Sequence, residues 1–222
     1  MTLSNEIFIF LKKIKLNNNR DWFQANKLNF KSQEVCVKEF GEELKSRLDL
    51  CDKIDSFKLF RIHRDIRFSK DKTPYKIYFG LTWKRIKPKY RGGYYFHISP
   101  GNNFLACGFW DPNSNDLNRI REELILNSND FKYIVNSSPL NTIWGELKGN
   151  ELKTAPRGVD KSHTDISLIR KKQYIFSIDY SDEEVCQKDF INKVEIALKA
   201  IRPFVDYMSE VLTTNKNGEP LF

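Results

Sequence analysis

The stretch YYFHISPGNNFLACGFW, residues 94–110, decides the fold class because it contains two strand-like runs joined by a tight turn. The runs Tyr94–Ser99 and Phe104–Trp110 are rich in aromatic and apolar residues, and Pro100-Gly101-Asn102 separates them. A short gap of turn-forming residues between two such runs is typical of a β-hairpin. A similar run precedes the hairpin at 77–83, and Pro88 and Gly92-Gly93 lie in the gap between them, so the sequence predicts an antiparallel meander. A further strand is expected at 173–178.

Apolar residues at helical spacing indicate helices at both ends of the chain. The first run covers residues 3–14, and Asp21 with Gln24 resembles a capping box that opens a second helix. Ser181 and Glu184 form another such pair ahead of a long final helix. We therefore predict an α+β protein with one domain spanning residues 1–222. In it, a central antiparallel sheet packs against an N-terminal helical hairpin and a long C-terminal helix.

Two further segments have strand-like patterns. From Lys58 onward the residues alternate, so that Phe60, Ile62, Ile66 and Phe68 would share one side of a strand and polar residues the other. This alternation predicts a strand with a continuous polar ladder. Leu147–Thr154, broken by Gly149-Asn150, is interpreted as a second hairpin.

The positive charge is concentrated in one central segment. The chain carries a formal net charge of +8. Between Phe57 and Arg91, twelve Lys or Arg residues stand against two acids, whereas the other 187 residues hold 25 basic and 27 acidic ones. Such localisation is expected of a surface that meets an anionic partner, although a solvated basic face would have the same composition.

Several classes of protein are excluded or disfavoured. No apolar run approaches the ~20 residues that span a bilayer, and the N-terminal apolar run lacks the preceding charge of a signal peptide, so we expect no membrane association. Four widely spaced cysteines favour a reducing cytoplasm over a disulfide framework or a zinc site. His63, His97 and His163 lie in separate segments, so we predict no metal, and nothing indicates a cofactor.

Catalytic motifs fail when their wider context is checked. His63-Arg64-Asp65 matches the kinase catalytic triplet, but Lys70 stands where a magnesium-binding Asn is required and no D-F-G follows. Ser69 and Lys72 have the S-x-x-K spacing of serine acyl-enzymes, yet the accompanying motifs are missing and Pro74 disfavours the required helix. Whether the protein is an enzyme therefore stays open.

The segment that follows suggests a nucleic-acid alternative. Arg91-Gly92-Gly93-Tyr94 is similar to the basic-glycine-aromatic signature of RNA-recognition strands but lacks an aromatic residue directly after the first glycine. Basic residues at 84–91 beside Tyr94 have the composition that single-stranded nucleic acid requires. An ordinary aromatic strand beside a charged hairpin loop accounts for the same residues.

The chain resembles a known family in several long motifs. These are 18–23 (NNRDWF), 60–76 (FRIHRDIRFSKDKTPYK), 94–100, 108–112 (GFWDP), and 156–158 (PRG) with His163. Together they are similar to the family called domain of unknown function 2461, over nearly the whole chain. The resemblance implies a compact single domain and supplies no activity, cofactor or catalytic residue. His63 stands where an aromatic residue such as Tyr is expected.

We predict that the basic block binds an anion. Arginine suits bidentate binding of phosphate or carboxylate, and Pro74 favours a rigid turn that brings hydroxyl and amide groups together. The candidate anion-binding residues are Arg61, Arg64, Arg67, Ser69, Lys70, Lys72, Thr73, Lys76 and Arg157. Asp65 and His163 are the acid–base candidates if there is catalysis.

Three functions are compatible with these sequence features. The first is a cytoplasmic domain for a phosphorylated or carboxylated small molecule. The second is a single-stranded nucleic-acid-binding module that uses residues 61–95. The third is a structural or protein-interaction role, in which Asp65 and Asp71 pair with the cations of the block and make it a latch.

Overall fold

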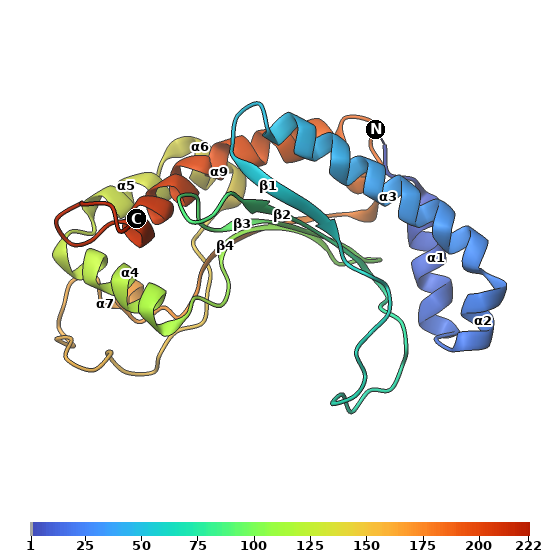
Figure 1. The fold of residues 1–222 in the computed structure, drawn as a ribbon, viewed down its shortest axis with the longest axis horizontal. Helices are drawn as coiled ribbons and strands as arrows, with labels where there is room; N and C mark the ends of the chain where they lie inside the picture. The colour runs from blue at the N-terminus through green and yellow to red at the C-terminus, as the bar shows by residue number, and fades with distance from the viewer. Residues whose placement is uncertain (1) are drawn as a thin grey trace. The chain divides into compact units, whose positions relative to one another are not determined.

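The predicted meander is present. A computed structural model describes residues 2–222, and its five strands form an antiparallel sheet in the order β1-β2-β3-β4-β5. The strands are β1 (Ile54–Leu59), β2 (Phe79–Arg85), β3 (Gly93–Ile98), β4 (Asn103–Phe109) and β5 (Tyr174–Tyr180). The fold is α+β, as predicted (Figure 1).

Helices precede the sheet, interrupt it between β4 and β5, and follow it. They are α1 (Asn5–Leu16), α2 (Arg20–Ala25), α3 (Lys27–Leu48), α4 (Ser114–Leu126), α5 (Asn129–Val135), α6 (Ser138–Trp144), α7 (Ile166–Ile169), α8 (Asp182–Val185) and α9 (Phe190–Thr213). The N-terminal helical region and the long C-terminal helix are thus confirmed. Within residues 2–222, no helix has both the length and the apolar character of a membrane span.

The helix caps confirm one sequence signal and correct another. Ser181 and Glu184 form the predicted capping box, but it opens only the short α8, and α9 begins separately at Phe190. Asp21 is not a cap: Asn19 Oδ1 accepts a hydrogen bond from the backbone N–H of Trp22 at 2.9 Å. Asparagine at the N-cap satisfies a helix N–H that has no partner within the helix, so α2 starts two residues earlier than the Asp21 pattern indicates.

The predicted strand from Lys58 to Phe68 is wrong beyond Leu59. Backbone hydrogen bonds from Arg64 N to Pro74 O and from Lys76 N to Ile62 O fold residues 60–78 back on themselves as a loop. Phe68, which the alternation placed with the apolar residues, is 95% exposed. The polar side chains of this loop bond to one another, which fixes a loop conformation rather than a ladder.

The predicted hairpin at Leu147–Thr154 is also wrong. Lys148 and Glu151 form isolated antiparallel bridges with Ile175 and Lys171, so the segment pairs with the chain around the start of β5 rather than with itself. Gly149 has a φ of 141°, and a Cβ there would lie 2.2 Å from the Gln173 carbonyl oxygen. The glycine therefore allows a close approach to the segment just before β5 and does not mark a turn.

Contacts within the chain divide it into two compact units. The first comprises Met1–Trp83, Tyr95–Leu105 and Asp179–Ile196, and the second comprises Lys84–Tyr94, Ala106–Ile178 and Ala197–Phe222. Strand β1 lies in the first unit, and β2 to β5 have residues in both.

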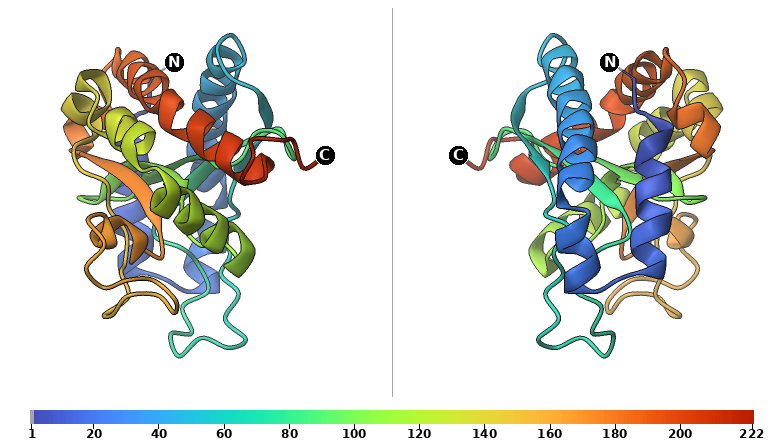
Figure 2. Two further views of the ribbon diagram at one scale, coloured as in Figure 1. Left: turned by 90° about the vertical axis from the view of Figure 1, so that its left-hand side faces the viewer. Right: turned by 90° about the vertical axis from the view of Figure 1, so that its right-hand side faces the viewer.

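In the first unit, helices cover one face of the sheet. The ring of Phe40 on α3 lies 6.1 Å from those of Phe96 on β3 and Phe190 on α9, and Trp83 Nε1 donates to the Gly41 carbonyl at 3.0 Å. Helices α1 and α3 run side by side (Figure 2). Because side chains alternate along a strand, the residues between the buried ones lie on the opposite face. The loop between β1 and β2 projects away from α3 (Figure 1).

The second unit has its own aromatic core. Phe131 of α5 lies 6.1 Å from Tyr174 on β5 and 6.2 Å from Phe204 on α9, and Phe204 lies 5.1 Å from Phe176. Trp144 Nε1 donates to the Ala197 carbonyl at 2.8 Å. The apolar stripe of the final helix is therefore core, as its spacing predicts.

Candidate functional site

The loop between β1 and β2, residues 60–78, is called the basic loop, and its base is fixed to the N-terminal helices. The side chain of Asn18 donates to the Tyr75 carbonyl at 2.9 Å and accepts from the Tyr75 N–H at 3.0 Å. The Tyr75 ring stacks on Phe23 of α2 at 4.0 Å between centroids. Asn18 belongs to the motif 18–23, but its pairing with Tyr75 could not be predicted because 57 residues separate them.

Within the basic loop, Arg64 is the centre of a hydrogen-bonded network. It donates to the Asp71 carboxylate and the Thr73 hydroxyl, and at 3.4 Å to Ser69 Oγ. Asp71 Oδ1 also accepts from the N–H and hydroxyl of Thr73, each at 2.9 Å. The Thr73 backbone N–H, then Arg64 and the Thr73 hydroxyl, lower the pKa of Asp71 to about 2. Arg64, Ser69 and Thr73 lie together in the structure, and they surround an internal carboxylate.

The other acid of the block is paired as well. Arg67 Nε and Nη2 donate to Asp65 at 3.0 and 2.7 Å, and this guanidinium lowers the pKa of the Asp65 carboxyl. A carboxyl held ionised in this way is a poor general acid. Lys72 Nζ donates to the Ile66 carbonyl at 3.0 Å, whereas Lys70 is exposed and makes no ion pair with the described residues. The latch interpretation, in which the acids of the block pair with its cations, therefore explains the contacts of Arg64 and Arg67.

Three basic side chains at the base of the loop have no carboxylate partner among residues 2–222. These are Lys58, Arg61 and Lys76, called here the cationic triad. Lys76 Nζ lies 5.4 Å from the Phe60 ring centroid and 5.6 Å from that of Tyr78, and Lys58 Nζ lies 5.5 Å from Phe60. Partial burial lowers the pKa of Lys76, and the charges of Arg61 and Lys58 lower it further. An anion placed here would relieve this mutual repulsion.

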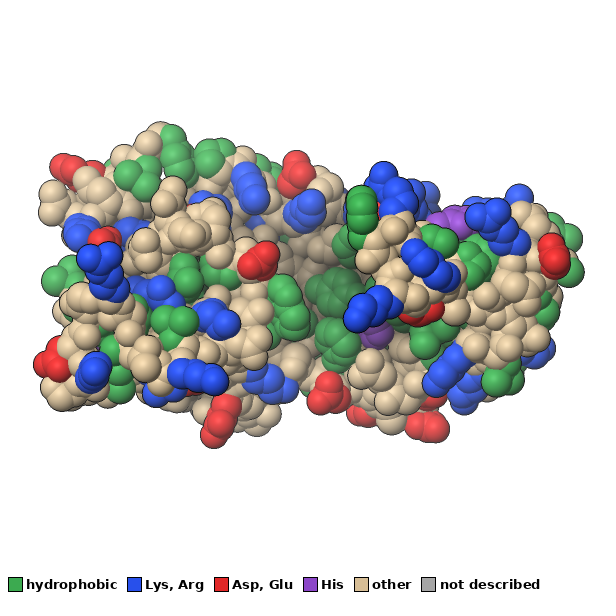
Figure 3. Space-filling model, turned by 90° about the horizontal axis from the view of Figure 1, so that it is seen from below, with side chains coloured by type: hydrophobic (Ala, Val, Ile, Leu, Met, Phe, Trp, Pro, Cys, Tyr) green, Lys and Arg blue, Asp and Glu red, His purple; other side chains and the backbone are tan. Residues whose placement is uncertain are grey.

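Lys76 also lines a pocket of about 480 Å³ at the foot of the basic loop. Its walls include Asn18, Arg64, Thr73 and Tyr78. The two carboxylates in the lining are those already paired with arginine. Of the nine predicted anion-binding residues, Arg64, Thr73 and Lys76 line this pocket. Lys and Arg side chains are spread over the face from which the loop projects, with Asp and Glu side chains among them (Figure 3).

The uncovered face of the sheet in the first unit carries a cluster of half-buried rings. The Tyr78 ring lies 4.3 Å from His97, and His97 stacks on Phe104 at 4.8 Å. Tyr95 contacts both His97 and Phe60, at 6.1 and 6.4 Å. We call these five residues the aromatic face. A Cβ at Gly80 would lie 2.9 Å from the Tyr95 hydroxyl, so the glycine makes room for the rings.

Burial rather than charge controls ionisation on the aromatic face. It lowers the pKa of His97 to about 4 and, with a smaller effect of Tyr78, raises the pKa of Tyr95 to about 12. The Tyr95 hydroxyl and His97 Nδ1 lie 3.0 Å apart, at hydrogen-bonding distance. His97 is thus a neutral, packed ring at pH 7, in accord with its position in an apolar strand.

Arg157 and His163 belong to the second unit and are not among the residues that line the pocket. His163 Nδ1 accepts from the Asp165 N–H at 3.0 Å, so the imidazole stabilises its own turn. Asp165 in turn accepts from Ser128 Oγ at 2.6 Å and pairs with Lys132. Arg157 is exposed in the loop before this turn. No group of His, Cys, Asp and Glu within residues 2–222 could hold a metal ion.

The two arginines of the second basic segment are used for structure, whereas Lys84, Lys87 and Lys89 are exposed. The Arg85 side chain is 0% exposed, pairs with Asp206, and donates to the Val205 carbonyl and Ser209 Oγ, each at 3.1 Å. Arg91 pairs with Asp116. Tyr94, the ring expected to stack on bases, is 1% exposed. The sequence could not reveal this because alternation alone does not show which face of a strand is covered.

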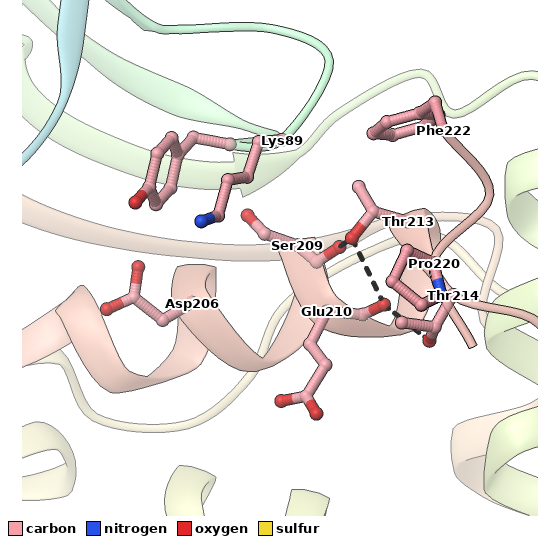
Figure 4. Close-up of a pocket in the computed structure, with 9 residues that line it drawn as sticks. Lys89, Asp206, Ser209, Glu210, Thr213, Thr214, Pro220 and Phe222 are labelled. Carbon is pink, nitrogen blue, oxygen red and sulfur yellow. Dashed lines mark hydrogen bonds between the residues drawn. The ribbon is translucent and has the colours of Figure 1, made fainter. Parts of the chain in front are cut away.

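The second unit has a pocket of about 440 Å³ beside α9 (Figure 4). The hydroxyls of Thr213 and Thr214 donate, at 2.8 Å each, to carbonyls one turn earlier. The charged residues that line this pocket are Lys89 and the two acids Asp206 and Glu210. This balance does not favour an anion, so the pocket of the first unit is the stronger candidate.

Fold and site together define an α+β protein with an antiparallel meander and a structured basic loop. A family model described as a conserved hypothetical protein, DUF2461, matches residues 6–207, and the chain belongs to this family. No curated protein and no solved structure matches the chain.

Proposed function

We propose that the first unit binds a phosphorylated or carboxylated small molecule at the pocket beside the basic loop, with Lys76 as its main charged contact. The observation that carries this proposal is the cationic triad, in which three positive charges lie close together and none forms an ion pair with a carboxylate among residues 2–222. Placing a partly buried ammonium beside other cations is unfavourable unless an anion compensates. The pocket volume lies within the usual range of about 300–1,000 Å³ for small-molecule sites.

The arginine network has a supporting role in this proposal. Arg64, Asp71 and Thr73 hold the loop closed, and Arg67 with Asp65 stabilises its tip, so the loop presents a rigid wall to the ligand. The proposal is one of binding, because Asp65 is held ionised and His163 bonds within its own turn. The free cysteines favour a reducing cytoplasm as its location.

The nucleic-acid module receives less support. It uses residues 61–95, and within them Arg85 and Tyr94 are buried and Arg91 is paired, although Lys84, Lys87 and Lys89 are exposed. Single-strand binding needs a groove of accessible cations along the backbone and exposed rings for stacking. A protein-interaction role is compatible with the exposed Lys70 and Phe68, but no feature of the described residues indicates a partner.

The proposal is tested by calorimetric titration of the protein with inorganic phosphate, pyrophosphate, ribose 5-phosphate and citrate. We expect saturable binding of at least one of them, and we expect Lys76→Met to weaken it tenfold or more, about 1.4 kcal/mol. Lys70→Met is the matched control, because Lys70 is an exposed lysine of the same loop outside the pocket, and it should change affinity less than twofold. Equal effects of the two variants, or no saturable binding, would overturn the proposal.

A further inference from the structure

The aromatic face begins where the cationic triad ends. Lys76 Nζ contacts the rings of Phe60 and Tyr78, so an anion bound by Lys76 would lie next to both rings. From Tyr78 the rings continue through His97 to Phe104, with centroid separations of 4.3 and 4.8 Å. All five rings are half-buried, on the face of the sheet opposite α3. A ligand held at the pocket would therefore have a stacking surface within reach of its charged group.

No carboxylate belongs to the aromatic face. The two acids that line the neighbouring pocket, Asp65 and Asp71, are paired with Arg67 and Arg64. His97 is uncharged at pH 7. Aromatic side chains next to cations recognise ligands that combine a flat ring with a negative group.

On these grounds we propose that the ligand of the pocket is an aromatic phosphate of the mononucleotide class. Its phosphate binds at Lys76, the member of the cationic triad that lines the pocket, and its base stacks on the Tyr78 end of the aromatic face. This inference rests on the proposed function and specifies its ligand. It goes further because it assigns a role in ligand binding to the aromatic face, which is not needed to bind an anion.

A free mononucleotide fits better than a nucleic-acid strand because the cations are gathered at one point. Lys58 and Lys76 lie over the same Phe60 ring, at 5.5 and 5.4 Å, and Arg61 follows that residue in sequence. Strand binding requires cations spaced along successive phosphates beside the stacking rings. In the first unit, the rings beyond Tyr78 have hydroxyl and imidazole neighbours but no cation-π partner among the described residues.

The first experiment compares ligands on the unaltered protein, by calorimetry at two salt concentrations. The ligands are AMP, CMP, GMP and UMP, together with ribose 5-phosphate, adenosine and an oligothymidylate. We expect at least one mononucleotide to bind tenfold or more tightly than ribose 5-phosphate, and to retain that advantage at the higher salt concentration. This comparison requires no variant to fold.

The second experiment assigns the stacking. Tyr78→Leu keeps an apolar side chain but removes the ring, so it should weaken binding of the mononucleotide more than binding of ribose 5-phosphate and reduce the preference between them to about twofold or less. Tyr95→Phe is the control, since it retains the ring and removes only the hydroxyl. Circular dichroism checks the folding of both variants, and an NMR contact between a base proton and the Tyr78 ring gives independent evidence.

The outcomes separate the inference from the proposed function. If ribose 5-phosphate binds through Lys76 and mononucleotides bind no tighter, the aromatic inference is overturned and the anion site remains. Binding of the oligothymidylate alone, lost as salt rises, would overturn the inference in favour of the nucleic-acid module. If no phosphate compound binds, the aromatic inference is overturned, and the proposed function is overturned with it unless citrate binds through Lys76.

Discussion

The side-chain amide of Asn18 forms two hydrogen bonds with the backbone of Tyr75, at 2.9 and 3.0 Å, and so closes the base of the basic loop. Asn18, which precedes α2, thereby fixes a segment that lies 57 positions later in the chain. Both backbone groups of Tyr75, a buried residue, depend on this one side chain.

Replacing Asn18 with Ala should destabilise the protein by about 1–3 kcal/mol, because the Tyr75 N–H and carbonyl lose their partner. Urea unfolding measures the change. Asn17→Ala is the control: the Asn17 side chain donates only to the exposed Lys13 carbonyl at 3.0 Å, so its loss should cost well under half as much. Similar costs for the two variants would contradict the role assigned to Asn18.

Asp71 should titrate well below an ordinary aspartate. Its pKa in the folded protein is about 2, against an ordinary value of 3.8, so the folded state prefers the ionised form. The interactions of Asp71 therefore stabilise the loop fully above about pH 4 and are lost as the pH falls through about 2. NMR titration of the carboxyl carbon measures the midpoint. Arg64→Ala should move it partly toward 3.8, because the Thr73 N–H remains. A midpoint near 3.8 in the unaltered protein would refute the network.

Arg85 should matter for stability rather than for binding. Its side chain is fully buried and bonds to Asp206, Val205 and Ser209. Arg85→Ala leaves a cavity and unsatisfied acceptors, and we expect a loss of about 3 kcal/mol, which lowers the thermal midpoint by about 6–12 °C. The neighbouring Lys84 is exposed, and Lys84→Ala should change stability by less than about 0.5 kcal/mol. Comparable thermal midpoints for Arg85→Ala and Lys84→Ala would show that Arg85 does not anchor the structure.

Gly108 should tolerate no side chain. Its φ is 122°, and a Cβ would lie 2.2 Å from the Tyr174 carbonyl oxygen and 3.1 Å from the Ile175 Cα. Gly108→Ala should cost at least about 2 kcal/mol, because it combines backbone strain with a clash against the neighbouring strand. Gly101 has a φ of 70° but no atom within 4 Å of a Cβ, so Gly101→Ala should cost only about 1 kcal/mol. Chemical denaturation of both variants checks the difference, and a larger loss for Gly101→Ala would contradict the predicted clash at Gly108.

The meander and the flanking helices could be predicted because their signals are local. Alternation in 94–99 and 104–110, a Pro-Gly turn between them and apolar stripes at helical spacing each depend on neighbouring residues. The basic loop could not be predicted in the same way. Its alternating residues look like a strand, but Arg64 bonds to Asp71 and Thr73, and Asn18 bonds to Tyr75, across separations that sequence periodicity does not encode.

The sequence by itself determined the meander of β2, β3 and β4, the helical ends and the concentration of positive charge in one segment. Only the tertiary structure decided which of those charges are engaged. Arg85 is buried against α9, Arg64 and Arg67 are paired with acids of their own loop, and Lys58, Arg61 and Lys76 are left without a carboxylate partner among the described residues. The physical reason is that a formal charge is a property of a residue, whereas its availability to a ligand depends on the partners and the burial that folding gives it.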